Sequence, residues 1–187
     1  MDTLLLLLPG LGDSGEDHWQ HYWLEKFPNA VKLKQGNWDK PALKDWLKRL
    51  NQVVESLDSP IIFVAHSLAA SLVAHWSINY VDRKVIGAML VAPADVDSSE
   101  HTPDSVRSFA PIPLQRLAFP SVVVASENDS FVSLERASFF AEQWGSYFIN
   151  LGKKGHINSE SRLKEWKEGQ EILENFIQNV VCNSVRD

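Results

Sequence analysis

The chain has 187 residues, of which 44% are hydrophobic, and we predict a single domain over residues 1–187. A formal net charge of −6 gives no electrostatic basis for binding nucleic acid or a membrane surface. The lone cysteine, Cys182, excludes an intrachain disulfide and favours a cytoplasmic location. Histidine, cysteine and carboxylate residues nowhere show metal-ligand spacing, so neither a metal nor a cofactor is expected.

Strand-like and helix-like segments alternate along the chain. Leucines 4–8 predict a buried strand, because the run is too short for a secretory signal or a membrane span. Later apolar segments predict a helix over 18–27, a strand over 30–33, a helix over 43–57, a strand over 61–65, a helix over 68–80 and a strand over 85–92. Strands over 120–126 and 148–151 follow, each with a helix after it. The last helix is expected to bury Leu163, Trp166 and Leu173.

This alternation predicts a three-layer α/β/α fold. The expected sheet has six mostly parallel strands in the order 2-1-3-4-5-6, with helices on both faces. No room remains for a cap domain, so only the irregular stretch 93–119 could shield a site, and loops of this length are usually functional or mobile. Residues 179–187 are predicted to be a frayed tail.

Ser67 stands between a predicted strand and a predicted helix, within the sequence Ala-His-Ser-Leu-Ala at 65–69. A sharp turn there holds the serine oxygen above the sheet edge, where the first amides of the helix point at any negative charge beside it. The strand and helix backbones nearly touch at such a turn, and Ala65 and Ala69 are small enough to allow this. We therefore interpret Ser67 as a nucleophile, with a plain helix N-cap as the alternative.

Asp129 and His156 extend this pattern. Each follows a predicted strand, and the chain order serine, acid, histidine is that of hydrolases with a parallel sheet. Because the carboxyl ends of parallel strands share one edge, the three side chains are predicted to meet there. Asp95 follows the strand 85–92 and is the rival candidate for the acid. It could instead hold the 93–119 loop through hydrogen bonds.

Two backbone amides are the candidate donors to an oxyanion. The amide of Leu68 directly follows the nucleophile, and the second donor is expected from the glycine-rich turn 9–15, with Leu11 the first choice and Gly12 the second. The run Gly-Leu-Gly-Asp-Ser-Gly at 10–15 also matches a dinucleotide fingerprint. The acidic residue expected about 20 residues later is missing at the end of the second strand, which argues against nucleotide binding.

Several other residues are candidates for the site. His18 either lines a pocket or packs under the first loop, and Phe109 and Trp19 are weaker candidates for pocket residues. Trp19 is more often a core residue than a substrate platform. His66, next to the nucleophile, is predicted to be structural.

Four motifs together resemble a known family. Pro-Gly-Leu-Gly-Asp-Ser-Gly at 9–15, Ala-His-Ser-Leu-Ala at 65–69, Gly-His-Ile-Asn at 155–158 and Trp-Lys-Glu-Gly at 166–169 are similar to the retinoblastoma-binding-protein-nine-like, or YdeN-like, serine hydrolases. The resemblance covers about residues 4–178. It implies a minimal α/β-hydrolase without a cap domain, and the serine, aspartate and histidine of the family fall on Ser67, Asp129 and His156. Family members often have glycine where this chain has Ala65 and Ala69.

The function expected from these observations is hydrolysis of a small carboxylic ester or a related acyl substrate through an acyl-enzyme on Ser67. The expected partner is this small molecule, with no nucleic acid and no membrane, and the sequence makes no prediction of oligomeric state. The alternative is a binding module that keeps the fold with little turnover, favoured by the alanines at 65 and 69.

Overall fold

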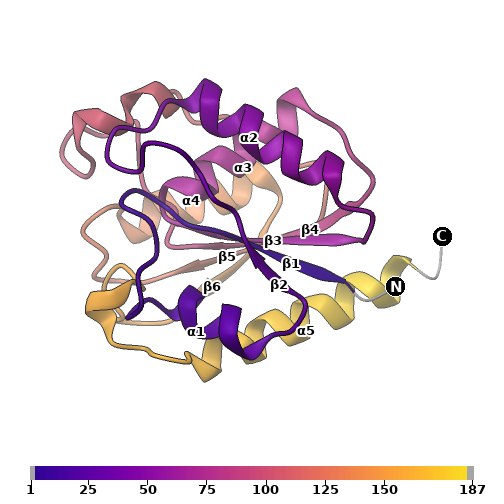
Figure 1. Cartoon of the computed structure of the whole chain (residues 1–187). Coiled ribbons are helices and arrows are strands. Elements are labelled where there is room, and N and C mark those ends of the chain that lie inside the picture. Colours follow the sequence, from indigo (N-terminus) through magenta and orange to yellow (C-terminus); the bar gives the residue numbers. More distant parts are fainter. Residues whose placement is uncertain (1–2, 185–187) are drawn as a thin grey trace.

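The computed structural model describes residues 3–184, and the side chains of residues 3–180 (Figure 1). Its elements follow one another as β1 (Leu4–Leu8), α1 (Trp19–Lys26), β2 (Ala30–Lys32), α2 (Leu43–Ser56), β3 (Ile61–His66), α3 (Leu68–Asn79), β4 (Val85–Val91), η1 (Asp104–Phe109), β5 (Ser121–Ala125), α4 (Leu134–Trp144), β6 (Tyr147–Asn150), η2 (Ser159–Ser161) and α5 (Lys167–Ser184). The labels η1 and η2 denote 3₁₀ helices.

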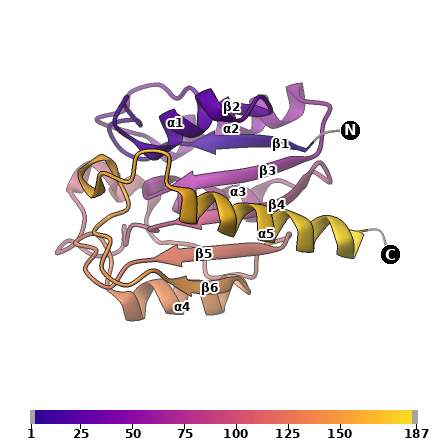
Figure 2. The same cartoon turned by 90° about the horizontal axis from the view of Figure 1, so that it is seen from below.

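One sheet carries all the strands that the described residues form. Its order is β2-β1-β3-β4-β5-β6 and every neighbouring pair is parallel, which confirms the predicted topology. Helices α1 and α5 cover one face, and α2, α3 and α4 cover the other (Figures 1 and 2). Because all strands run in one direction, the loops after β1, β3, β4, β5 and β6 share the carboxyl edge of the sheet.

The core has two parts, one on each face of the sheet. Successive side chains of a strand point to opposite faces, so Leu6 and Leu8 of β1 join the cluster under α2, α3 and α4. Leu5 and Leu7 join the cluster under α1 and α5. Both faces of the central strands are therefore apolar, which explains the unbroken run of leucines.

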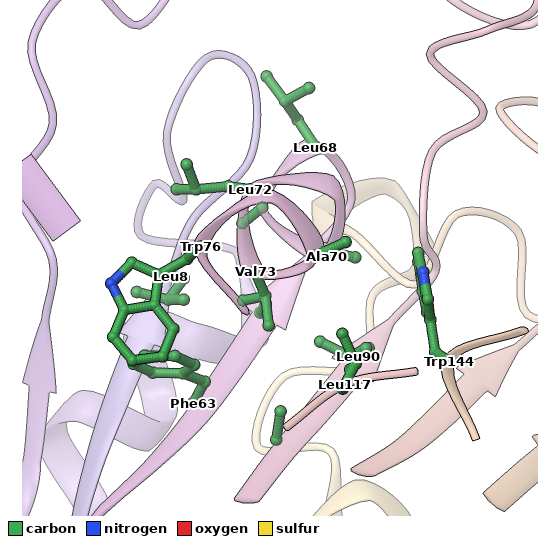
Figure 3. Packing of buried hydrophobic residues seen from close by; sticks show 14 of the residues in the cluster. Leu8, Phe63, Leu68, Ala70, Leu72, Val73, Trp76, Leu90, Leu117 and Trp144 are labelled. Atoms are coloured by element: carbon green, nitrogen blue, oxygen red, sulfur yellow. The ribbon is translucent and has the colours of Figure 1, made fainter. Parts of the chain in front are cut away.

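Helix α3 lies directly on the sheet. Figure 3 shows Trp76 of α3 beside Phe63 of β3, and their ring centroids are 5.3 Å apart in an edge-to-face contact. Val73 is fully buried on the same helix. Since α3 begins right after Ser67, this packing also fixes the position of that serine.

The segment before α5 differs from the prediction. Leu163 and Trp166 lie in the loop before the helix, which begins at Lys167. Trp166 has a left-handed backbone (φ 42°), and a Cβ at Gly169 would lie 2.3 Å from its ring. The absence of a side chain at 169 is thus required by the indole packed against it. Helix α5 continues to Ser184, through residues predicted to be frayed, while 185–187 lie outside the described residues.

The long stretch between β4 and β5 is part of the core. Val106, Phe109 and Ile112 are buried in it, and the Phe109 ring packs edge-on against Trp46 at 5.6 Å. The Arg107 guanidinium donates hydrogen bonds to carbonyl oxygens within the same stretch. Within residues 3–184, none of the helices is both long enough and apolar enough to span a bilayer.

Candidate active site

Ser67, Asp129 and His156 come together at the carboxyl edge of the sheet, after β3, β5 and β6 respectively. The Nε2 atom of His156 lies 2.8 Å from Ser67 Oγ. Its Nδ1 atom lies 2.9 and 2.8 Å from the two carboxylate oxygens of Asp129. A carboxylate only accepts hydrogen bonds, so Nδ1 carries the proton and Nε2 is free to accept the serine proton.

The turn that carries Ser67 is strained. Its φ of 57° and ψ of −120° are rare for a residue with a side chain and cost about 1–3 kcal/mol. The Ser67 amide donates to the Val91 carbonyl (2.9 Å), which secures the turn to β4. Ala65 and Ala69 are fully buried on either side. The sharp strand-to-helix turn therefore forms with alanine at both positions.

Gly10 lies against this turn. A Cβ at position 10 would be 3.0 Å from both Ser67 Cβ and the His66 carbonyl oxygen, and 3.3 Å from the Leu68 amide nitrogen. Only a glycine allows the backbone after β1 to come this close. The sequence singled out the glycine-rich turn 9–15, but not the contact between Gly10 and Ser67.

Two amides near Ser67 are available to a substrate oxygen. Leu68 is the first residue of α3, so its N–H has no acceptor within the helix. Among the described residues, the Leu11 amide also has no hydrogen-bond acceptor, whereas the Gly12 amide donates to the Trp38 carbonyl at 3.0 Å. The amide of Leu11, the first choice from the sequence, is thus without an acceptor among the described residues, whereas that of Gly12 is already used.

The loops that carry Asp129 and His156 are joined to each other. Asp129 Oδ1 also accepts from the Phe131 amide (2.8 Å), and its side chain is fully buried. The Phe131 ring lies 4.3 Å from the His156 ring. Asn128 Oδ1 accepts from the Gly155 amide at 2.8 Å. Sequence analysis did not identify Asn128 or Phe131, whose only local signal is their proximity to Asp129.

Asp95, the rival acid, has a different partner. Its Oδ2 accepts from Arg136 Nε at 3.3 Å, and its carbonyl accepts from the Thr102 hydroxyl at 3.0 Å. Its amide donates to the Phe131 carbonyl, and Oδ1 is buried without a partner among the described residues. Asp95 thus holds the long loop, and the carboxylate beside His156 is that of Asp129.

His18 and His66 form a buried row with His156. The ring centroids are 4.7 Å apart for His18 and His66, and 5.0 Å for His66 and His156. His18 is the N-cap of α1, and its Nδ1 accepts from the Gln20 amide. His66 Nε2 is 3.0 Å from the His156 carbonyl oxygen and donates to it. His18 therefore packs under the first loop, and His66 is structural as predicted.

Burial keeps both of these histidines neutral. It lowers the pKa of His18 to about 3, and the charges of His156 and Lys32 act in the same direction. The pKa of His66 is likewise well below its usual value, first because of burial and then because of His18 and His156. The imidazole of His156 thus has uncharged neighbours on this side.

Trp19 and Phe109 do not line a pocket. Trp19 is 1% exposed, and its indole N–H donates to the Ile157 carbonyl at 2.7 Å, which supports the His156 loop from below. Phe109 has no exposed surface. Both predictions of a pocket role are wrong because long-range packing draws these rings into the core. Among the described residues, no group of histidine, cysteine and carboxylate side chains could hold a metal ion.

The parallel sheet and the contacts at its carboxyl edge define an α/β-hydrolase fold without a cap domain in the described residues. The chain belongs to the serine hydrolase family, whose pattern it matches over residues 5–175. It is similar to a YdeN-like hydrolase of Pectobacterium atrosepticum, with 30% identity and a TM-score of 0.85 over 96% of this chain and 92% of the other. These findings confirm the resemblance noted in the sequence.

More distant structures share the fold. The ydeN gene product of Bacillus subtilis is 19% identical with a TM-score of 0.77, over 95% of this chain and 100% of the other. Est1E from Butyrivibrio proteoclasticus, solved with ferulic acid bound, is 14% identical with a TM-score of 0.71, over 97% and 90%. No curated protein matches the chain.

Proposed function

We propose that the protein hydrolyses small carboxylic esters or related acyl compounds through an acyl-enzyme on Ser67. The observation that carries this proposal is the unbroken contact from Ser67 Oγ through the His156 ring to the Asp129 carboxylate, with 2.8 Å on each side of the imidazole. Membership of the serine hydrolase family supports the same class of reaction.

The proposed mechanism uses one base in both halves of the reaction. His156 Nε2 takes the Ser67 proton as Oγ attacks the acyl carbon, and Asp129 stabilises the resulting imidazolium. Nε2 then gives this proton to the departing alcohol, leaving an ester on Ser67. A water molecule, deprotonated by the same nitrogen, attacks the ester carbon, and the proton returns to Ser67 as the carboxylic acid leaves.

The negative charge of each tetrahedral intermediate is assigned to the amides of Leu11 and Leu68. Fixed donors of this kind contribute about 3 kcal/mol each to transition-state stabilisation. Their availability supports the proposal, since neither amide has a hydrogen-bond acceptor among the described residues.

A small ester is the favoured substrate class because the site has little cover. No cap domain lies over the carboxyl edge in the described part of the chain, and the long loop after β4 is packed into the core. The protein therefore offers few contacts to parts of a substrate that are remote from the acyl carbon, and large substrates use such contacts to lower the activation barrier. Esters have better leaving groups than amides and need less of this assistance. The cytoplasmic location stays a prediction, which cell fractionation would test.

The proposal is tested with p-nitrophenyl esters of increasing acyl length. We expect turnover that is greatest for short chains and that falls by about 10³-fold or more in Ser67→Ala, since the nucleophile is lost. Ser71→Ala is the matched control, because Ser71 is also a buried serine, lies one turn into α3 and has a hydroxyl without a partner among the described residues. A Ser67→Ala variant as active as the wild-type protein would overturn the proposal.

A further inference from the structure

One sheet face is left uncovered beside the last helix. Helix α5 runs along the middle of the sheet, and β5 and β6 lie beside it with no helix over them on that face (Figure 2). Tyr147 and Ile149 of β6 pair with Val122 and Val124 of β5, which belong to the core cluster under α5. Paired residues point to the same face of a sheet, so Tyr147 and Ile149 point to this face. Tyr147 is 73% exposed although it lies within the sheet.

This uncovered face forms one wall of a cavity of about 530 Å³. Ile172 and Phe176 of α5 form the opposite wall, and Trp144 with Gly145 lies at one end. The volume is within the range of about 300–1,000 Å³ that is typical of small-molecule sites. Its wall strands contribute their amino ends, so the cavity lies at the edge of the sheet opposite to Ser67.

One charge stands at the rim of this cavity, and it is positive. The Arg116 guanidinium lies over the backbone of Gly145, where an added Cβ would be 3.0 Å from Cζ. It has no hydrogen bond or ion pair with any described residue, so its five N–H donors are free. None of the described residues that line the cavity is acidic, in a chain whose net charge is −6. The amides of Asn175 and Asn179 on α5 add uncharged polar groups to the lining.

The partial negative charge at the carboxyl end of α4 accounts for part of this arrangement. Gly145 is the C-cap of α4, and a cation there is favoured by the helix dipole. That interaction is weak and leaves the guanidinium donors unused. A planar guanidinium at an apolar cavity matches the carboxylate end of a molecule whose remaining part is apolar.

We propose that this cavity is a second binding site, for a small amphipathic carboxylate whose apolar part lies between Ile149 and Phe176 and whose carboxylate pairs with Arg116. A small molecule fits better than a protein surface, because the site is a concave cavity and, of the described residues that line it, Arg116 alone is charged. The proposal is independent of hydrolysis at Ser67.

The test measures decanoate binding to the full chain by calorimetry, with amide NMR shifts to locate the ligand. We expect saturable binding that shifts the Gly145 amide and the Trp144 indole signal. Arg116→Ala should weaken decanoate binding by about tenfold, as expected for loss of a charge-assisted pair, and leave the binding of neutral 1-decanol unchanged. Arg49→Ala, an exposed arginine on α2 across the sheet, is the matched control and should bind decanoate like the wild type.

A second variant keeps the test decisive. Asn175 is exposed on α5 beside the cavity, so Asn175→Trp should fill the space and abolish binding of both decanoate and 1-decanol. Three results would overturn the proposal. These are no saturable binding, shifts that cluster around Ser67 and resist both variants, or self-association that Asn175→Trp disrupts while decanoate does not bind.

Discussion

Ser67 and His156 are within hydrogen-bonding distance of each other, yet the chain positions them in different ways. Ser67 belongs to the elbow, residues 65–69, which is enclosed by buried alanines and by Gly10. His156 belongs to the histidine loop, residues 151–166, whose backbone accepts hydrogen bonds from Trp19 and His66 and donates one to Asn128. Close packing around the backbone is therefore prominent at the elbow, and hydrogen bonds from distant residues are prominent at the histidine loop.

This difference determines how each region should respond to substitution. The backbone geometry of the elbow should be sensitive to added volume. The histidine loop has left-handed backbone at Ile157, Arg162 and Lys164, so part of its hydrogen bonding offsets conformational strain. Removing a donor from it should lower both stability and activity.

The largest effect is expected at the carboxylate that orients the histidine. Asp129→Asn should lower kcat by about 10³–10⁴-fold, because an amide favours the wrong imidazole tautomer. Asp95→Asn is the matched control. Because Asp95 pairs with Arg136 and not with His156, this variant should retain kcat within about tenfold. Steady-state kinetics on a p-nitrophenyl ester decides this, and the assignment fails if Asp95→Asn is the inactive variant.

The next effect concerns volume at the elbow. Gly10→Ala should lower kcat/KM by about 10²-fold, since its Cβ would push Ser67 and the Leu68 amide out of position. Gly15→Ala lies in the same turn with no atom within 4 Å of the added Cβ, and should leave kcat/KM unchanged. Equal kcat/KM values for the two variants would show that close packing does not fix the elbow.

A smaller effect is expected when the histidine loop loses a donor. Trp19→Phe removes the hydrogen bond to the Ile157 carbonyl and should cost about 1–3 kcal/mol of unfolding free energy, together with a several-fold loss of kcat/KM. Trp144→Phe removes a matching bond to the Pro113 carbonyl, far from Ser67. It should cost similar stability and no activity. Denaturant unfolding and kinetics on both variants separate the two roles.

The last effect concerns the pH dependence of stability and leaves the catalytic groups unchanged. The folded protein leaves His18 unprotonated down to about pH 3, whereas the unfolded chain binds this proton near pH 6.5. The unfolding free energy should therefore fall as pH drops from 6.5 towards 3, by up to about 1.4 kcal/mol per pH unit from His18.

His18→Asn keeps an N-cap acceptor for α1 and removes this titration. Its unfolding free energy should depend less on pH between 6.5 and 4, with the contribution of His66, which has the same sign, remaining. Urea melts at several pH values measure the slope. An unchanged slope would mean that His18 is not held neutral by burial.

Local sequence patterns predicted the strands and the positions of Ser67, Asp129 and His156, because strands and the turns after them leave short-range signals. The order of the strands was predicted with the help of the general rule that such crossovers are right-handed. Local patterns did not predict that Phe109 joins the core, since its partner Trp46 is distant in the sequence. They also did not place the start of α5. Trp166 lies in the loop before this helix, yet it packs into the same core cluster as the apolar residues of the helix. Such errors come from long-range packing, which helical or strand periodicity does not encode.

The most direct test of the account is labelling with a fluorophosphonate, which reacts with an activated serine, followed by peptide mass spectrometry. We predict one phosphonylated residue, Ser67, in the folded wild-type protein. Labelling should be absent in Ser67→Ala and much slower in His156→Ala, which leaves the hydroxyl without its base. Folded wild-type protein that stays unlabelled, or that carries the label on another residue, would contradict the account.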